Sequence, residues 1–351
     1  MKNPHLKRWR NATLAAATLT PLVAGLLAPT AAEARINVHC AGGASSHQGI
    51  GPSQDAGIRQ VDPIVSHNEP TSMHEHQFFG SLYNFTAPHP ESANYSDYLG
   101  TKTSCNILKD TASYWAPVLR YKGSNKIVPV KRFEAYYLSW NNKITDPSKQ
   151  TRVIPRDLRM VAGNPMAQSR KDANLNQVSW SCSQFSSKGA ASGFRSYSPE
   201  DANCAESVSL LPGEQRFLTA IVHFPTCWTG RFNNHNRTGN TADFVGTPGA
   251  EGNQVAYTVN GKCPPGYPIK LMMLRFTESW DYRGDGKDVY LSSGMGDAAG
   301  EGFTYHADFW NTWDQAFLQK ALNQCINTTR PDSELHESTS KPGVCGIKLK
   351  G

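Results

Sequence analysis

The sequence has few charged residues and little that would place it in a membrane or on a nucleic acid. Asp, Glu, Lys and Arg make up only 18% of the 351 residues, which excludes a disordered chain kept open by charge. After the first 34 residues, no apolar run reaches the ~20 residues that a membrane span needs. The basic residues form one small group, at Lys122, Lys126, Lys131 and Arg132. Neither a nucleic acid nor a membrane span is therefore expected.

Several familiar motifs are also missing. The sequence contains no G-x-S-x-G, no P-loop and no Rossmann fingerprint. None of its eight cysteines forms a C-x-x-C pair, which argues against a zinc ribbon or a thioredoxin-type site. An even number of cysteines instead favours four disulfides if the chain is secreted. Pairing near neighbours gives Cys182–Cys204, Cys227–Cys263, Cys325–Cys345 and Cys40–Cys105 as the expected bonds.

The first 34 residues have the features of a cleaved secretory signal. Basic residues between Lys2 and Arg10 precede an apolar run from Ala15 to Leu27, and Ala32-Glu33-Ala34 gives a cleavage signature. We therefore expect a secreted protein. We also expect it to be a monomer. The expected organisation is a signal peptide (1–34), an extended Gly/Ser-rich arm (35–60), one domain (61–326) and a polar tail tied by a disulfide (327–351).

Short segments of β-type composition recur along the domain and are bounded by Gly, Pro, Asn or Ser. Apolar residues at helical spacing predict one helix over 311–326, capped by Asn311 or Thr312. The polar stretches 164–204 and 229–262 are predicted to be surface loops. The fold class is therefore mainly β, a single sandwich or jelly-roll-like domain with long loops and one C-terminal helix. The predicted strands are 116–121, 126–130, 133–138, 156–161, 215–224 and 270–276.

Two short motifs carry the residues that are most able to do chemistry. His74 and His76 lie on one face if their segment is a strand, because side chains alternate with a period of two. His306 and Asp308, just before the predicted helix, also lie on one face if their segment is a strand. The three imidazoles are candidate ligands for a divalent metal ion such as Zn, Cu or Fe. Without a metal, the same four residues could act as acid and base.

Aromatic residues beside polar groups suggest a second kind of site. Tyr114, Trp115, Trp228 and Trp280, with the carboxylate of Glu278, have the composition of a sugar-binding surface. Glu278 and Asp281 are also candidates for a pair of glycosidase carboxylates, whose separation the sequence does not give. The alternative for each aromatic residue is a place in the hydrophobic core.

Taken in order, short motifs between Val61 and Cys325 resemble a secreted family of unknown function from fungi, actinobacteria and other bacteria. Some fungal members are joined to WSC carbohydrate-binding modules. The resemblance implies an extracellular location and a candidate site, and no particular reaction. The motifs are Asp62-Pro-Ile-Val, His74-x-His76 with Gly80-Ser81, Ser113-Tyr-Trp-x-Pro117, Tyr136-Tyr-Leu138, Leu158-Arg-Met-Val-Ala-Gly163, Phe224-Pro-x-Cys-Trp-x-Gly230, Val255-Ala-Tyr257 with Cys263-Pro-Pro, and His306-x-Asp-Phe309 with Trp313-Asp314.

The chain departs from this family pattern downstream of Cys227. Thr229 replaces an Asp, and Gln254 stands where a His is expected, while His235 lies in a longer loop. A metal site of four histidines is thereby put in doubt. The remaining candidates are His74, His76, His306 and Asp308.

These observations favour a protein that acts on an extracellular or cell-wall polysaccharide, as a hydrolase rather than a lyase, through the His/Asp cluster. One alternative is a non-catalytic protein that binds glycans or associates with the wall. Another is a metalloenzyme acting on a different polymer. A third alternative is that the polar cluster only stabilises the fold.

Overall fold

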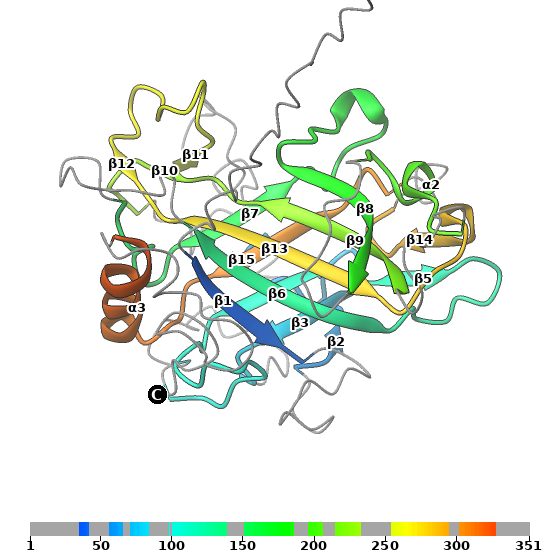
Figure 1. The fold of residues 1–351 in the computed structure, drawn as a ribbon, viewed down its shortest axis with the longest axis horizontal. Helices are drawn as coiled ribbons and strands as arrows, with labels where there is room; N and C mark the ends of the chain where they lie inside the picture. Colours follow the sequence, from blue (N-terminus) through cyan, green and yellow to red (C-terminus); the bar gives the residue numbers. More distant parts are fainter. Residues whose placement is uncertain are drawn as a thin grey trace, which may run out of the picture. The chain divides into compact units, whose positions relative to one another are not determined.

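Two five-stranded antiparallel sheets form the centre of the fold (Figure 1). The first has the order β1-β6-β13-β9-β8 and the second the order β2-β3-β4-β15-β7. The computed structural model describes residues 35–41, 56–65, 71–83, 98, 100–138, 151–185, 196–205, 215–232, 254–294 and 302–327.

The strands of the first sheet come from segments far apart in the sequence. Its central strand, β13, pairs with β6 on one side and with β9 on the other. The sheet's outer strands are β1, paired with β6, and β8, paired with β9. The bounds are β1 (Arg35–Cys40), β6 (Val130–Leu138), β8 (Val178–Phe185), β9 (Gln215–His223) and β13 (Met273–Trp280).

The second sheet holds the two motifs that the sequence singles out. Three of its strands, β3, β4 and β15, lie side by side, and β2 and β7 complete it. The bounds are β2 (Ile58–Arg59), β3 (His76–Gly80), β4 (Ser113–Pro117), β7 (Arg159–Gly163) and β15 (His306–Trp310).

The main core lies between the two sheets. Phe79 of β3 stacks on Phe133 of β6 with ring centroids 3.9 Å apart. Tyr114 of β4 meets the ring of Phe276 on β13 edge to face. Because side chains of a strand alternate between faces, the residues between these positions point to the other face of the second sheet. The mainly-β, sandwich-like architecture predicted from the sequence is confirmed.

Shorter elements surround the two sheets. β5 pairs with β14, and β10 lies between β11 and β12. These elements are β5 (Leu119–Tyr121), β10 (Cys227–Trp228), β11 (Val255–Ala256), β12 (Ile269–Lys270), β14 (Val289–Leu291), the 3-10 turns η3 (Arg170–Asp172) and η6 (Gly286–Asp288), α2 (Pro199–Ala202), α3 (Gln315–Ala321) and a π-helical turn, η8 (Leu322–Ile326).

The C-terminal helix is present, but its predicted cap was wrong. Asp314 is the N-cap, and its carboxylate accepts a hydrogen bond from the backbone N–H of Phe317. Asn311 instead donates its side-chain amide to the carbonyl oxygens of Ile154 and Pro155. The side chain of Thr312 bonds to the carbonyl of Thr111. Oδ1 of Asn311 accepts from the backbone N–H of Trp313, one residue before the N-cap, and not from the first turn of the helix.

Three other expectations about segments need correction. The stretch 164–204 is not all loop, because it contains β8. Of 126–130, only Val130 belongs to a strand of a sheet. Arg35–Cys40, assigned from the sequence to an arm, forms β1, while 42–55 and the predicted signal (1–34) and tail (328–351) lie outside the described residues.

Three of the four predicted disulfides are confirmed: Cys40–Cys105, Cys182–Cys204 and Cys227–Cys263. Cys325 is also disulfide-bonded, and its predicted partner, Cys345, lies outside the described residues. Disulfides of this kind are typical of oxidising compartments and are compatible with an extracellular protein. In the described part of the chain, no helix has the length and apolar character to cross a membrane.

Candidate functional site

The candidate site lies on the outer face of the second sheet, away from the core between the sheets. His76 is the first residue of β3, and His306 is the first residue of β15. Asp308 follows two positions after His306 and therefore points to the same face. Trp115 of β4 lies directly opposite Asp308 in the strand register. Burial is nearly complete for His76, His306 and Asp308, which are 0–2% exposed.

The three candidate histidines, His74, His76 and His306, come together in the fold. The ring centroid of His74 lies 4.3 Å from that of His76 and 5.1 Å from that of His306. Nε2 of His74 is 3.3 Å from Nε2 of His306. His74 reaches the cluster from the turn that precedes β3, where Ser72 holds its backbone, and not from a strand as the alternation argument assumed.

Backbone carbonyls fix the orientation of two of these imidazoles. Nδ1–H of His76 donates to the carbonyl oxygen of Val61 over 2.9 Å. Nδ1–H of His306 donates to the carbonyl oxygen of Thr304 over 2.8 Å. A neutral imidazole with Nδ1 protonated has a lone pair on Nε2. This is how a protein presents a histidine to a metal ion, with one nitrogen tied to a carbonyl and the other bare.

Three ligand atoms, one from each histidine, lie within 4.8 Å of one another. Atoms bound to one ion at ~2.1 Å in tetrahedral geometry lie ~3.4 Å apart. The Nε2 atoms of His74 and His306, 3.3 Å apart, have this separation. His74, His76 and His306 could therefore hold a divalent metal ion as a facial set of three nitrogens.

Asp308 extends this set. Its Oδ2 lies 3.7 Å from Nε2 of His306, and neither of its oxygens has a hydrogen-bond partner among the described residues. Nε2 of His76 also has no such partner. Buried polar atoms without partners are costly, and a buried carboxylate without a countercharge is more so. A cation at this point would satisfy both residues.

Burial sets the protonation of the cluster. It lowers the pKa of each of the three imidazoles to about 3, and repulsion between the rings contributes. The rings are therefore neutral near pH 7, which is the form that binds metal ions. Burial raises the pKa of Asp308, and the negative charge of Asp62 raises it further.

A cavity of about 420 Å³ lies against His74 and His306. Met73 and Met166 stand at its rim with most of their side chains exposed. His76 and Asp308 lie deeper and do not line it. The lining consists of apolar residues (Val65, Met73, Val161, Pro165 and Met166) and polar ones (Asp62, Ser72, His74, Asn164, Ser292, Ser293, Gly294 and His306).

Asp62 is a site residue that the motif analysis assigned no role. Its Oδ1 accepts hydrogen bonds from the backbone N–H groups of Ile64 and Val65, and the carboxylate lines the cavity. Burial raises its pKa, although these two bonds oppose the shift. The Asp-Pro step marks a turn, but nothing local in the sequence shows that this turn faces β15.

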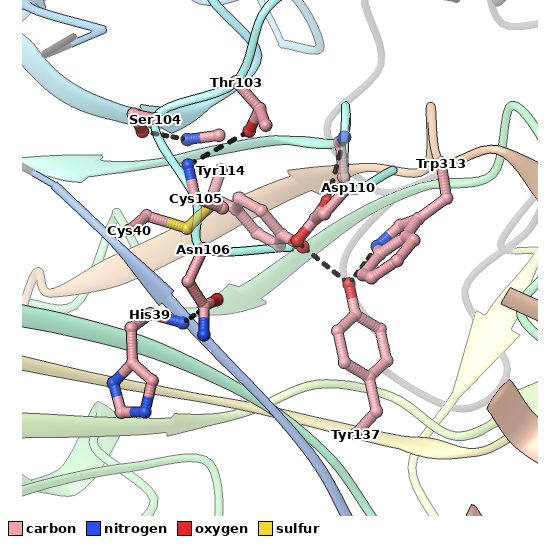
Figure 2. Close-up of a disulfide and its surroundings, with 12 residues drawn as sticks. His39, Cys40, Thr103, Ser104, Cys105, Asn106, Asp110, Tyr114, Tyr137 and Trp313 are labelled. Carbon is pink, nitrogen blue, oxygen red and sulfur yellow. Dashed lines mark hydrogen bonds between the residues drawn. A yellow bond between two sulfur atoms is a disulfide. The ribbon is translucent and has the colours of Figure 1, made fainter. Parts of the chain in front are cut away.

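The aromatic residues predicted to bind substrate do not line the cavity. Tyr114 is fully buried between the sheets, where its hydroxyl donates to Asp110 and contacts the hydroxyl of Tyr137 (Figure 2). Trp115 is also fully buried and stacks on Phe78. A buried ring cannot stack on a sugar, so the prediction of substrate contact is wrong for both residues.

Glu278 and Trp280 are buried on β13. Trp280 stacks on Trp180, and Glu278 accepts a hydrogen bond from the hydroxyl of Tyr305 over 2.5 Å. Both residues are core residues, so neither is in a position to touch substrate. Trp228, on β10, is only partly buried and packs against Phe232, away from the cavity lining.

A comparison with protein families identifies the family of this chain. Residues 62–313 match a family model described as a domain of unknown function, DUF1996. The chain belongs to this family. The DUF1996 region begins at Asp62 and includes all three histidines and Asp308. No curated protein and no solved structure matches the chain.

Proposed function

We propose that this DUF1996 protein is a secreted metalloenzyme that acts on an extracellular or cell-wall polysaccharide, as a hydrolase or a lyase. His74, His76 and His306 hold a divalent ion, and Asp308 balances its charge. The observation that carries the proposal is the convergence of the three imidazoles, two of them with Nδ1 tied to a carbonyl and Nε2 bare.

A metal ion explains the cluster better than acid–base chemistry without a metal. Without an ion, His74 can donate its Nε2–H to Nε2 of His306, which satisfies those two atoms. Nε2 of His76 and both oxygens of Asp308, all buried, would still lack hydrogen-bond partners among the residues that the structure describes. An ion shared by the cluster satisfies all of them, and it supplies a Lewis acid that lowers the pKa of bound water.

A catalytic role fits the geometry better than a glycan-binding surface. Three of the four aromatic residues that would form such a surface, Tyr114, Trp115 and Trp280, have no exposed ring face. The chemistry-bearing residues instead meet beside a cavity that substrate can enter. The disulfides support an extracellular location, and polysaccharide is the polymer proposed there.

The first test of this function is metal content. The secreted full-length protein is purified without chelator, and its metals are measured by elemental analysis. We expect close to one divalent ion per chain. His74→Ala should lower the metal affinity by more than ~10–100-fold, which is the loss caused by removing a residue that only orients a ligand. His223→Ala, a histidine of β9 outside the cluster, is the matched control and should retain the ion.

A folded wild-type protein that binds no Zn, Cu, Mn or Fe, even when each metal is added, would contradict the proposal. Activity is then tested on a panel of polysaccharides by measuring soluble products. Removal of the metal by a chelator should abolish product formation, and addition of the metal should restore it.

A further inference from the structure

The cavity beside the histidine cluster is apolar along much of its wall. Val65 and Val161 are two of its five apolar lining residues, and the methionines at its rim are exposed, Met73 by 77% and Met166 by 60%. A thioether side chain is flexible and adapts to apolar groups of different shapes. A small apolar group is therefore favoured inside this cavity.

The cavity also lacks positive charge. No Lys or Arg is among its described lining residues. The lining residues lie within 62–74, 161–166 and 292–306, and none of these segments contains a Lys or Arg. The carboxyl group of Asp62 lines the cavity. A negative group at this place attracts a metal cation and repels an anionic sugar such as a uronate.

The lining does not suit cleavage of a glycosidic bond. Glycosidases usually place two carboxyl groups on either side of that bond. Among the described residues that line the cavity, Asp62 is the only carboxylate, because Asp308 lies beneath the histidines. No described aromatic ring lines the cavity to stack on a sugar. Elimination from a uronate requires its carboxylate to be neutralised, and no Lys or Arg among the described lining residues can do this beside the ion.

We infer that the site hydrolyses an acyl substituent on an uncharged glycan, such as an acetyl ester, and leaves the glycan chain intact. This inference rests on the proposed metalloenzyme function and names its substrate class. The alkyl part of the acyl group packs against the apolar wall near Val65 and Val161. The carbonyl carbon then lies toward His74 and His306.

The reaction needs only water as a second reactant. The oxygen of a water molecule bonds to the acyl carbon, and Asp62, at the cavity wall, accepts the proton that water loses. The bond between the acyl carbon and the sugar oxygen then breaks. The sugar oxygen takes up the proton held by Asp62, so that the products are a free sugar hydroxyl and a carboxylic acid. An ion held by the histidines would stabilise the negative charge on the acyl oxygen.

The test uses the full-length protein loaded with Zn²⁺ and three probes. These are O-acetylated cello-oligosaccharides, the same oligosaccharides without acetyl groups, and O-acetylated polygalacturonate. Acetate, new reducing ends and unsaturated uronate ends are measured in every reaction. From the acetylated cello-oligosaccharides we expect acetate without new reducing ends, and from the unacetylated ones no product. Acetate release from acetylated polygalacturonate should be slower than from the first probe by at least ~10-fold.

Two variants test the residues involved. Asp62→Asn keeps the acceptor oxygen that bonds to Ile64 and Val65, and should lower acetate release by ~100-fold or more without changing the Zn content. Asp281→Asn changes an exposed carboxylate that directly follows β13 and is not among the cavity lining residues, and it is the matched control. Met166→Lys changes an exposed rim residue and should raise the relative rate on acetylated polygalacturonate several-fold.

The outcomes separate the inference from the function beneath it. Reducing ends or unsaturated ends without acetate overturn the acyl inference and leave a metal-dependent glycan enzyme. Binding of close to one Zn²⁺ per chain, with no acetate from either acetylated probe, also overturns the acyl inference. Failure to bind a metal at all overturns the proposed function itself.

Discussion

Glu278 is a carboxyl group whose charge the fold suppresses. It is fully buried on β13, where Oε2 accepts the hydrogen bond of Tyr305 and Oε1 has no hydrogen-bond partner in the described part of the chain. Burial raises its pKa from an ordinary 4.5 to about 8, although the bond from Tyr305 opposes the shift. Folding therefore requires Glu278 to take up a proton at any pH between these two values.

This requirement predicts an unusual pH dependence of stability. The group's contribution is fully present below pH 4.5 and is lost as pH rises toward about 8. Glu278→Gln stays neutral, still accepts from Tyr305 and lacks this titration. Relative to this variant, the wild-type free energy of unfolding should thus fall by a few kcal/mol over this range, at ~1.4 kcal/mol per pH unit. Urea denaturation at pH 5 and pH 8 measures the difference.

The control for this prediction is Glu200→Gln, on the exposed helix α2. Its denaturation midpoints should follow the wild type at both pH values. If Glu278→Gln also follows the wild type at both, the carboxyl is ionised in the folded protein and our explanation of its burial is wrong.

At this scale the sequence singled out residues that the fold brings together, but it did not identify the residues that surround them. His74, His76, His306 and Asp308 were found because two H-x-H/D patterns are rare combinations of ligand-type residues. Asp62 was missed because only the tertiary fold brings its turn to β15. The aromatic residues were misjudged since Trp and Tyr beside polar groups have the same composition in a core as at a sugar-binding surface.

The elements of the fold show a similar division. Helix α3 was predicted from its apolar spacing, but Asp314 rather than Asn311 or Thr312 begins it. Local sequence allows all three residues as caps. The choice depends on contacts over 150 residues away in the chain, since Asn311 bonds to Ile154 and Pro155.

Asp314 therefore provides a test at the level of one helix. Asp314→Ala removes the acceptor for the N–H of Phe317 and should lower the free energy of unfolding by ~1 kcal/mol. Asp314→Asn retains an acceptor at the same position and should keep most of the wild-type value. Denaturation in urea measures both. An equal loss in the two variants would show that the charge, through Lys109 at 3.6 Å, matters more than the cap.

β8 illustrates what periodicity cannot predict. Its sequence, Val178–Phe185, contains three Ser and a Gln and was assigned to a loop. It is nevertheless a full strand paired with β9 along its whole length. Ser179 and Ser181 are buried, so polar composition here does not mean a surface loop. Pairing with a neighbouring strand overrides the low apolar content of the segment.

At the scale of the whole molecule, the pairing of distant strands is the part that composition cannot supply. Strands inside each sheet have neighbours that are distant in the sequence, as β13 has in β6 and β9, and β15 has in β4 and β7. Such topology depends on which hydrophobic faces meet in three dimensions. The mainly-β class was predictable, and so was the near-neighbour disulfide pairing. The assignment of strands to two sheets was not.

The Cys40–Cys105 disulfide joins these two layers. Cys40 ends β1 in the first sheet, while Ser104, next to Cys105, exchanges hydrogen bonds with Gly80 of β3 in the second (Figure 2). The bond thus connects the edge of one sheet to the strand that carries His76. It closes a loop of 65 residues, for which chain entropy predicts a stabilisation of about 4 kcal/mol.

Replacing both cysteines tests this connection without leaving a free thiol. Cys40→Ser/Cys105→Ser should lose about 4 kcal/mol in urea denaturation, and amide hydrogen exchange in β3 should become faster. Cys182→Ser/Cys204→Ser is the matched control: it opens a 22-residue loop beside β8 and should lose about 3 kcal/mol with exchange in β3 unchanged. Since metal binding needs His76 held in place, only the first variant should also bind the ion more weakly. Equal exchange in β3 for the two variants would mean that packing between the sheets, rather than the disulfide, holds that strand.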